Sequence, residues 1–490
     1  MSKSVIIIGA GFAGLSAACF MARAGWDVTV IEKNETAGGR ARQLKAEGFT
    51  FDMGPSWYWM PDVFERFFHQ FGKNVNDYYS LKRLDPSYRI YWQDSYMDLP
   101  AEYKELRNLF ESIEKGSGSN LDQYLKEAAY KYKIGVQNLV YKPGQSFTEF
   151  LEWDVIKNVF RLDVFTSIKK HIARFFKNEK LRQIMEFPVL FLGALPEHTP
   201  ALYSLMNYAD IKGGTWYPKD GMFSIVLAMQ HLAKELGVKF FFNEEVQEIM
   251  IEQSSVKKVK TTRNSYEANA IISGGDYYFT ETVLLPKEYR SYSEDYWNKK
   301  VLAPSCILFY VGLSKKLKNV LHHSLFFDVD FNKHADEIYR DPQWPSHPLF
   351  YLSASSKTDE TVAPAGCENL VFLIPVASGL QNDTEEVREL YFNKLVKRLE
   401  QQTGEQISDS IIFKKSFSVS DFVTDYHSYK GNAYGLANTL RQTAIFRPSC
   451  KSKKVKNLFY TGQFTVPGPG VPPSLISGEV VAKQVLKSFN

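Results

Sequence analysis

The sequence predicts an α/β fold built around a parallel β-sheet. Three observations support this class: an apolar strand pattern at residues 5–8, a glycine-rich turn leading into an apolar helix pattern, and a second apolar strand pattern at 28–31. A strand, a helix and a second strand in this order form a βαβ unit. Its strands are apolar throughout because helices cover both faces of a parallel sheet. With 490 residues, the chain has room for about three structural units.

Each part of this first unit follows from its residues. Val5-Ile6-Ile7-Ile8 is a short continuous apolar run, as expected of a strand buried on both faces. Residues 15–22 form an apolar helix pattern, and Gly25 ends it. Residues 28–31 form the second strand, which is followed at once by Glu32.

The turn between the first strand and the helix predicts a Rossmann-like dinucleotide site. Gly9 permits a tight turn, Gly11 lets the backbone approach a diphosphate, and Gly14 allows close packing of helix on strand. The helix amino terminus offers free N–H groups to the phosphates, and Glu32 can accept hydrogen bonds from ribose hydroxyls. The neighbouring candidate cofactor contacts are Phe12, Ala13 and Lys33.

A second glycine pair decides which dinucleotide is expected. Gly38, Gly39 and Arg40 follow Glu32 closely, and Arg40 can give charge-assisted hydrogen bonds to a diphosphate. This E-x(5)-GGR segment resembles the second fingerprint of the FAD-dependent amine oxidase and phytoene desaturase superfamily. The resemblance implies that the chain binds FAD tightly and without a covalent bond.

The next segment narrows the resemblance. Residues 51–56 (FDMGPS) are similar to the F-D-x-G-P-[ST] segment of the bacterial-type carotenoid desaturases, in which this loop passes close to the flavin. The resemblance implies that Pro55 and Ser56 contact the cofactor. The aromatic run at 57–61 could line an isoprenoid channel or could serve only as packing.

The carboxyl-terminal end carries the most specific match. Residues 456–462 are expected to form a strand that ends in a glycine, and residues 463–473 are too rich in proline and glycine for regular structure. Ser474 is expected to cap a final helix, whose positive end would face the flavin ring. The string TGxxxxPGxGVPxxxxSGE resembles the terminal motif of bacterial-type phytoene desaturases. The matched flavin-side positions are Gly462, Gly470, Val471 and Pro472.

Several middle segments resemble the same family. Residues 193–218 and 431–448 resemble two sequence stretches of the family, Val246 matches the valine whose backbone brackets the adenine, and Asp276 ends a strand that looks like the one returning towards FAD. Asp220 stands where the family usually has glycine, so a left-handed backbone there is expected to be costlier.

The spread of these matches predicts a discontinuous FAD-binding domain made of residues 1–76, 215–285 and 452–490. A strand-rich substrate domain is expected from 77–102 and 286–451. Residues 103–214 match the family least and are expected to form a helical, membrane-facing insertion.

Composition excludes several other functions. A net charge of +4 gives no global footprint for nucleic-acid binding. Four widely spaced cysteines fit reduced thiols in the cytoplasm, and no Cys or His spacing indicates a metal site. Residues 5–22 mimic a signal peptide, but they carry the glycine motif and run into a strand. No other run is long and apolar enough to span a bilayer.

One stretch of the insertion is both basic and amphipathic. Residues 156–182 have eight basic side chains against two acidic ones, with apolar residues at helical spacing. A cationic amphipathic helix suits the anionic surface of a membrane, although a domain-covering helix with a solvated basic face would show the same pattern. The basic residues are Lys157, Arg161, Lys169, Lys170, Arg174, Lys177, Lys180 and Arg182, and the apolar ones are Val164, Phe165, Ile168, Ile172, Phe175 and Phe176.

Together, the resemblance implies an FAD-dependent desaturase that introduces C=C bonds into an acyclic or hydroxylated carotenoid by hydride transfer to the flavin. The implied partners are a carotenoid, the inner membrane as a peripheral docking surface, and oxygen or a quinone as electron acceptor. No catalytic base is identified. The alternatives are a carotenoid isomerase of the same fold, an amine or porphyrinogen oxidase, which should lack the carboxyl-terminal motif, and a non-enzymatic lipid-binding escort protein.

Overall fold

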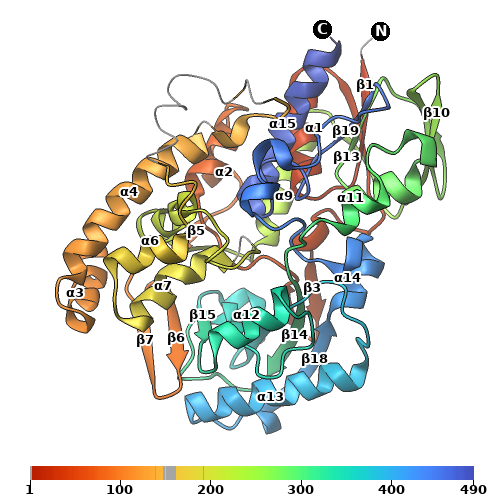
Figure 1. Ribbon diagram of the computed structural model, residues 1–490. Helices are drawn as coiled ribbons and strands as arrows, with labels where there is room; N and C mark the ends of the chain where they lie inside the picture. The colour runs from red at the N-terminus through yellow and green to blue at the C-terminus, as the bar shows by residue number, and fades with distance from the viewer. Residues whose placement is uncertain (1–2, 138, 147–148, 150–161, 191–192, 490) are drawn as a thin grey trace.

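The computed structural model describes residues 3–137, 139–146, 149, 162–190 and 193–489 (Figure 1). Its first sheet is parallel throughout, with strand order β19-β13-β1-β2-β9. The chain therefore has the α/β class with a parallel sheet that the first βαβ unit predicted. The strands are β1 (Ser4–Ile8), β2 (Asp27–Ile31), β9 (Lys239–Phe241), β13 (Ala270–Ser273) and β19 (Leu458–Tyr460).

Three helices from distant parts of the chain pack around this sheet in the upper part of Figure 1. Helix α1 (Phe12–Arg23) packs against both α9 (Phe223–Glu235) and the final helix α15 (Val471–Phe489). The close contact of α1 with α15 needs a glycine, because a side chain at Gly478 would place its Cβ 2.5 Å from the carbonyl oxygen of Ala13. Helices from the first and last parts of the sequence thus pack together close to the first glycine turn.

A second, larger sheet lies in the lower part of the molecule, in the order β18-β14-β17-β16-β15-β6-β7. Its strands pair antiparallel except for β15 and β6, which are parallel. Side chains of α13 (Glu385–Thr403) pack into its apolar core. The strands are β6 (Tyr88–Trp92), β7 (Ser95–Leu99), β14 (Ser305–Leu313), β15 (His323–Phe326), β16 (Phe350–Ser353), β17 (Glu368–Val376) and β18 (Ile411–Phe417).

Three smaller sheets complete the strand content of the described residues. They form the three-stranded sheet β10-β11-β12 and the pairs β3-β4 and β5-β8. The strands are β3 (Gln43–Ala46), β4 (Phe49–Asp52), β5 (Leu81–Arg83), β8 (Trp216–Pro218), β10 (Val246–Glu252), β11 (Ser255–Thr261) and β12 (Ser265–Tyr266). The remaining short helices are α2 (Pro61–His69), α10 (Tyr277–Phe279), α11 (Glu294–Asn298), α12 (Phe331–Tyr339) and α14 (Val419–Tyr426).

Helices α3 (Tyr103–Ile113), α4 (Ser117–Gln137), α6 (Ile168–Phe175) and α7 (Glu179–Leu190) lie together on the left of Figure 1. The short helix α8 (Leu205–Tyr208) packs against α4 and α7. In the described part of the basic stretch, Ile168, Ile172 and Phe176 are fully buried in the main core. The expectation of an apolar face free to enter a membrane was wrong for these three residues. Lys157 and Arg161 lie outside the described residues.

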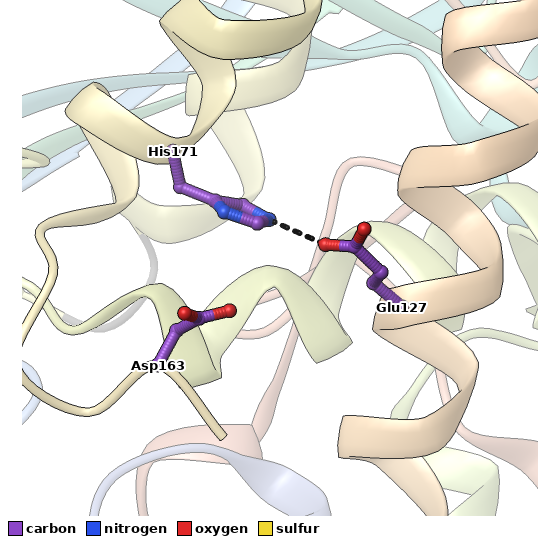
Figure 2. A group of neighbouring side chains, drawn as sticks. All are labelled: Glu127, Asp163 and His171. Atoms are coloured by element: carbon purple, nitrogen blue, oxygen red, sulfur yellow. Dashed lines mark ion pairs between the residues drawn. The ribbon is translucent and has the colours of Figure 1, made fainter. Parts of the chain in front are cut away.

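A partly buried polar group joins α4, α6 and the segment before α6. Figure 2 shows His171 turned towards Glu127, with Asp163 across from both. The His171 Nε2 lies 3.7 Å from a Glu127 carboxylate oxygen, and burial lowers the pKa of His171 to about 4. Lys131, only 1% exposed, lies with its Nζ 2.9 Å from an Asp163 oxygen and 3.2 Å from the Ala201 carbonyl. Because this ammonium already neutralises one carboxylate, we assign no metal to the group.

Two further expectations concern the start of the final helix and the backbone at Asp220. The final helix begins at Val471, so the expected cap at Ser474 was wrong: Pro472 and Pro473 occupy the first turn, where a missing N–H costs nothing. Asp220 does adopt the left-handed conformation, with φ of +67°. Its amide donates to an Asp359 carboxylate oxygen at 2.8 Å, which helps to hold the turn. Within the described ranges, no helix is both long and apolar enough to cross a bilayer.

Candidate cofactor and substrate cavity

A single cavity of about 500 Å³ lies where the carboxyl ends of the parallel strands meet the larger sheet. One end is lined by the glycine turns of the first sheet and the other by apolar side chains of the second. Every residue that the sequence singled out as a cofactor contact lines this cavity except Gly14. Those residues are Gly9, Gly11, Phe12, Ala13, Glu32, Lys33, Gly39, Arg40, Pro55, Ser56, Val246, Asp276, Gly462, Gly470, Val471 and Pro472.

The first glycine turn forms the floor of one end. Gly14 lies behind it, where a Cβ would come 2.1 Å from the Gly9 carbonyl oxygen, so only glycine fits. Gly11 differs, because a Cβ there would meet nothing within 4 Å and would instead extend into open space. Helix α1 begins after Gly11 without a side-chain cap, which leaves its first N–H groups available to an anion.

Glu32 is buried directly after β2 and is held in place by the backbone. One carboxylate oxygen accepts the Ala10 N–H at 2.8 Å, and the other accepts the Asn34 N–H at 2.9 Å. The Asn34 side-chain amide donates a third hydrogen bond, at 2.8 Å. A carboxylate can accept about four hydrogen bonds, so capacity is left for about one from a ribose hydroxyl.

The second glycine loop lies against the first. The Gly38 N–H donates to the Ala10 carbonyl at 2.9 Å, and Gly11 and Gly38 form a parallel bridge. Arg40 extends from this loop and donates to the Ser428 hydroxyl at 2.8 Å. Its Nε is buried and, within the described residues, has no hydrogen-bond partner. An unsatisfied guanidinium N–H on a residue that lines the same cavity as Gly11 fits the diphosphate of FAD.

One further acid and one further helix end face the cavity. Asp276 accepts the N–H of Phe279 at 3.2 Å and that of Tyr429 at 3.2 Å. Burial raises the pKa of Asp276 to about 6, although the nearby Arg40 cation opposes this. Helix α15 begins at the cavity with Val471, so its positive end faces the same space, as expected for a flavin-side helix.

The other end of the cavity is apolar. It is lined by side chains of β14 to β17, α7 and α12, and Trp57 and Trp59 reach it from the first domain segment. Trp57 also packs against Trp59 and Phe187, so these rings serve both the packing and the lining role that the sequence left open. The apolar lining residues include Phe187, Met206, Leu308, Leu325, Phe327, Phe331, Ile338, Leu349 and Leu373.

No sequence motif pointed to α12, yet it forms one wall of the apolar end. Phe331, His334, Ala335 and Ile338 share a face at helical spacing and line the cavity. The His334 Nδ1 accepts the Leu349 N–H at 3.0 Å, which leaves the proton on Nε2, and this atom donates to the Pro375 carbonyl at 2.9 Å. Burial also lowers the pKa of His334 to about 4. The imidazole is therefore neutral and fully bonded, and it is unsuited to act as a base.

Comparison with known proteins agrees with this arrangement. Residues 12–486 match the family described as flavin containing amine oxidoreductase. The chain is 40% identical over 489 residues to a carotenoid 3,4-desaturase of Haloarcula japonica, with 99% of each chain covered. It is 30% identical over 492 residues to a zeta-carotene-forming phytoene desaturase of Myxococcus xanthus, covering 99% of this chain and 94% of that protein.

Solved structures show the same fold at much lower identity. An oxidoreductase from Methanosarcina mazei superimposes with a TM-score of 0.64 and 14% identity, covering 98% of this chain and 100% of that one. A fatty acid isomerase from P. acnes superimposes with a TM-score of 0.61 and 15% identity. The full-length family match and the 40% identity show that the chain belongs to the flavin-containing amine oxidoreductases and, within them, to the carotenoid desaturase family.

Proposed function

We propose that the protein is an FAD-dependent desaturase that introduces C=C bonds into an acyclic or hydroxylated carotenoid. One observation carries the proposal: a single cavity joins a dinucleotide cradle to a wall of apolar side chains. A polyene has few polar groups, so an apolar pocket is the kind of site that binds it. The names of the two relatives, a carotenoid 3,4-desaturase and a phytoene desaturase, support the same substrate class.

We propose that the residues of the glycine turns, Glu32, Arg40, Val246, Asp276 and the start of α15 hold FAD. When bound, FAD supplies an acceptor for a hydride, which no amino-acid side chain provides. The chain itself orients the diphosphate through Arg40 and the amino terminus of α1. The apolar wall excludes water and positions the hydrocarbon at the cofactor end of the cavity. Because His334 is neutral and already bonded, it does not take the second proton, and we assign no catalytic base.

The two sheets suggest how the chain is divided. The strands of the parallel sheet all come from residues 1–76, 215–285 and 452–490, and those of the larger sheet from 77–102 and 286–451. We propose these ranges as an FAD-binding domain and a substrate domain, with 103–214 as a helical cap. We further propose that oxygen or a quinone accepts the electrons, and that the enzyme works in the cytoplasm, bound peripherally to the inner membrane.

The test of this function is anaerobic incubation of the holoenzyme with liposomes that contain phytoene, or in parallel a 1-hydroxylated carotenoid. Bleaching of the flavin absorbance together with a product that has a longer conjugated chain is expected for at least one substrate. A product with only a changed cis–trans geometry would indicate an isomerase instead. A flavin-loaded protein that bleaches with neither lipid would overturn the proposed function.

We propose that membrane docking is electrostatic. Because Ile168 and Ile172 are buried, the exposed face of α6 carries Lys169, Lys170 and Arg174. A basic side chain near an anionic surface contributes on the order of 1 kcal/mol. Changing these three to Glu is therefore expected to weaken co-sedimentation with anionic liposomes by more than about tenfold.

The control for this prediction is the same change of charge at another site. Lys257, Lys258 and Lys260 all lie on β11, which pairs with β10. Strand β10 lies on the side of the molecule opposite α6 in Figure 1. Replacing these three by Glu should leave liposome binding close to the wild type. Equal loss of binding in both triple variants would show that only net charge matters, and no loss in the α6 variant would remove this docking surface.

A further inference from the structure

Residues 424–428, at the carboxyl end of α14 and just beyond it, lie over the cradle that holds the glycine turns. They belong to the part of the chain that also forms the larger sheet, whereas the cradle belongs to the parallel sheet. Asp425, Tyr426 and His427 line the cavity. The segment is therefore a bridge between the two halves of the molecule at the cofactor end of the cavity.

Residues 424–428 contact Lys33, Arg40 and Arg42, which lie in or next to the segment from Glu32 to Arg40. The Lys33 ammonium donates to the Thr424 carbonyl at 2.9 Å, and Asp425 forms an ion pair with Arg42. The ring of Tyr426 lies 5.3 Å from the Arg40 guanidinium and 5.2 Å from that of Arg42. The segment thus touches the same loop that faces the diphosphate.

His427 makes the outermost contact. Its Nε2 lies 2.5 Å from a carboxylate oxygen of Glu245 and 3.4 Å from the Lys33 ammonium, and its ring stacks on Phe279 at 3.9 Å and 4°. Glu245, Lys33 and Phe279 all line the cavity on the side of Glu32 and Val246, where adenosine is expected. The His427 and Glu245 side chains are 29% and 36% exposed, so their contact lies at the rim.

His427 is the carboxyl cap of α14. Its φ is +51° and its ψ is +32°, a left-handed conformation of the kind that often ends a helix. The residue that makes the rim contact with Glu245 and Phe279 is therefore also the point at which the helix ends.

We propose that residues 424–428 form a clasp over the adenosine end of the FAD cavity, closed by the contact of His427 with Glu245, and that FAD enters and leaves when this clasp opens. The closed clasp holds FAD in two ways: it blocks the rim of the cavity, and its residues contact the cofactor. Opening it breaks the His427 contacts and moves residues 424–426, the last residues of α14, while the start of that helix stays in place. The proposal depends on the flavin cofactor and not on the identity of the carotenoid.

The test measures both directions of FAD exchange for the holoenzyme. Release is followed after dilution by ultrafiltration and absorbance of the retained FAD, and binding by addition of FAD to the stripped protein. His427→Ala and Glu245→Ala are each expected to raise the release rate about tenfold. Because both remove the same closing contact, the double variant should be no faster than the faster single variant. The binding rate should rise as well, since the open state is then more populated.

Matched variants keep the result interpretable. Val423→Ala changes an exposed side chain of the same helix and should exchange FAD like the wild type. Glu245→Gln keeps a hydrogen-bond acceptor for His427 and should restore most of the slow release. If His427→Ala fails to fold, the surface variants of Glu245 still decide the question. Unchanged release in Glu245→Ala overturns the clasp; faster release with an unchanged binding rate also overturns it, because His427 would then be an ordinary contact.

Discussion

Gly11→Val is expected to give a folded protein that no longer binds FAD. Gly11 has φ of −74°, which valine adopts easily, and a Cβ at this position meets nothing within 4 Å. The apoprotein should therefore lose little stability. The new side chain would occupy the space where the diphosphate is expected to approach the backbone. We expect FAD affinity to fall by at least about a hundredfold, because at least two charge-assisted hydrogen bonds would be displaced.

This result is measured by FAD titration of the stripped protein together with its thermal unfolding. Gly213→Val is a matched control, since that glycine also has room for a side chain but lies away from the cavity. Gly14→Ala is the contrasting variant: its Cβ would collide with the Gly9 carbonyl, so it should lower the unfolding temperature as well as FAD binding. Normal FAD affinity in a folded Gly11→Val protein would mean that the cofactor does not lie against this turn.

The cofactor end of the cavity could be predicted because its signals are local. A glycine motif between a strand and a helix fixes the turn, the helix end and the acid after the second strand within about 30 residues. The resemblance to the family then predicted Gly462 and Gly470 as further cofactor contacts. Gly462 lies 459 residues after Lys3 and Gly470 lies further along the chain, yet the carboxyl-terminal segment that carries them is close to α1 in space. The structure lines up these positions along one cavity.

The sequence could not show whether the apolar side of a helix packs on the protein core or faces a membrane. Residues 168–176 have the same amphipathic pattern whether their apolar side meets lipid or protein. Only the packing of α6 on α4 shows that Ile168 and Ile172 point into the core, next to the group formed by Lys131 and Asp163. The clasp was missed for a related reason: His427 and Glu245 are 182 residues apart, and neither lies in a motif that implies the other.

Helix α12 was also missed, and it leads to the second large effect. Ala335→Trp is expected to abolish desaturation while leaving FAD in place. Ala335 lines the apolar end of the cavity together with Phe331 and Ile338, and its small side chain leaves room that an indole would fill. A carotenoid could then no longer reach the cofactor end. We expect the desaturation rate to fall by at least about a hundredfold, the effect of misplacing a reacting group by an ångström or more.

Lys333→Trp is the matched control, because it adds the same ring to the solvent side of the same helix. It should retain FAD and activity. Overpacking at Ala335 costs about 1–3 kcal/mol, so its thermal unfolding and FAD content must be measured first to show that the protein is still folded and yellow. If such a protein desaturated at the wild-type rate, the carotenoid would have to reach the flavin by a path that avoids α12. If activity vanished with FAD retained, the apolar wall formed by β14 to β17 and α12 would be the carotenoid channel.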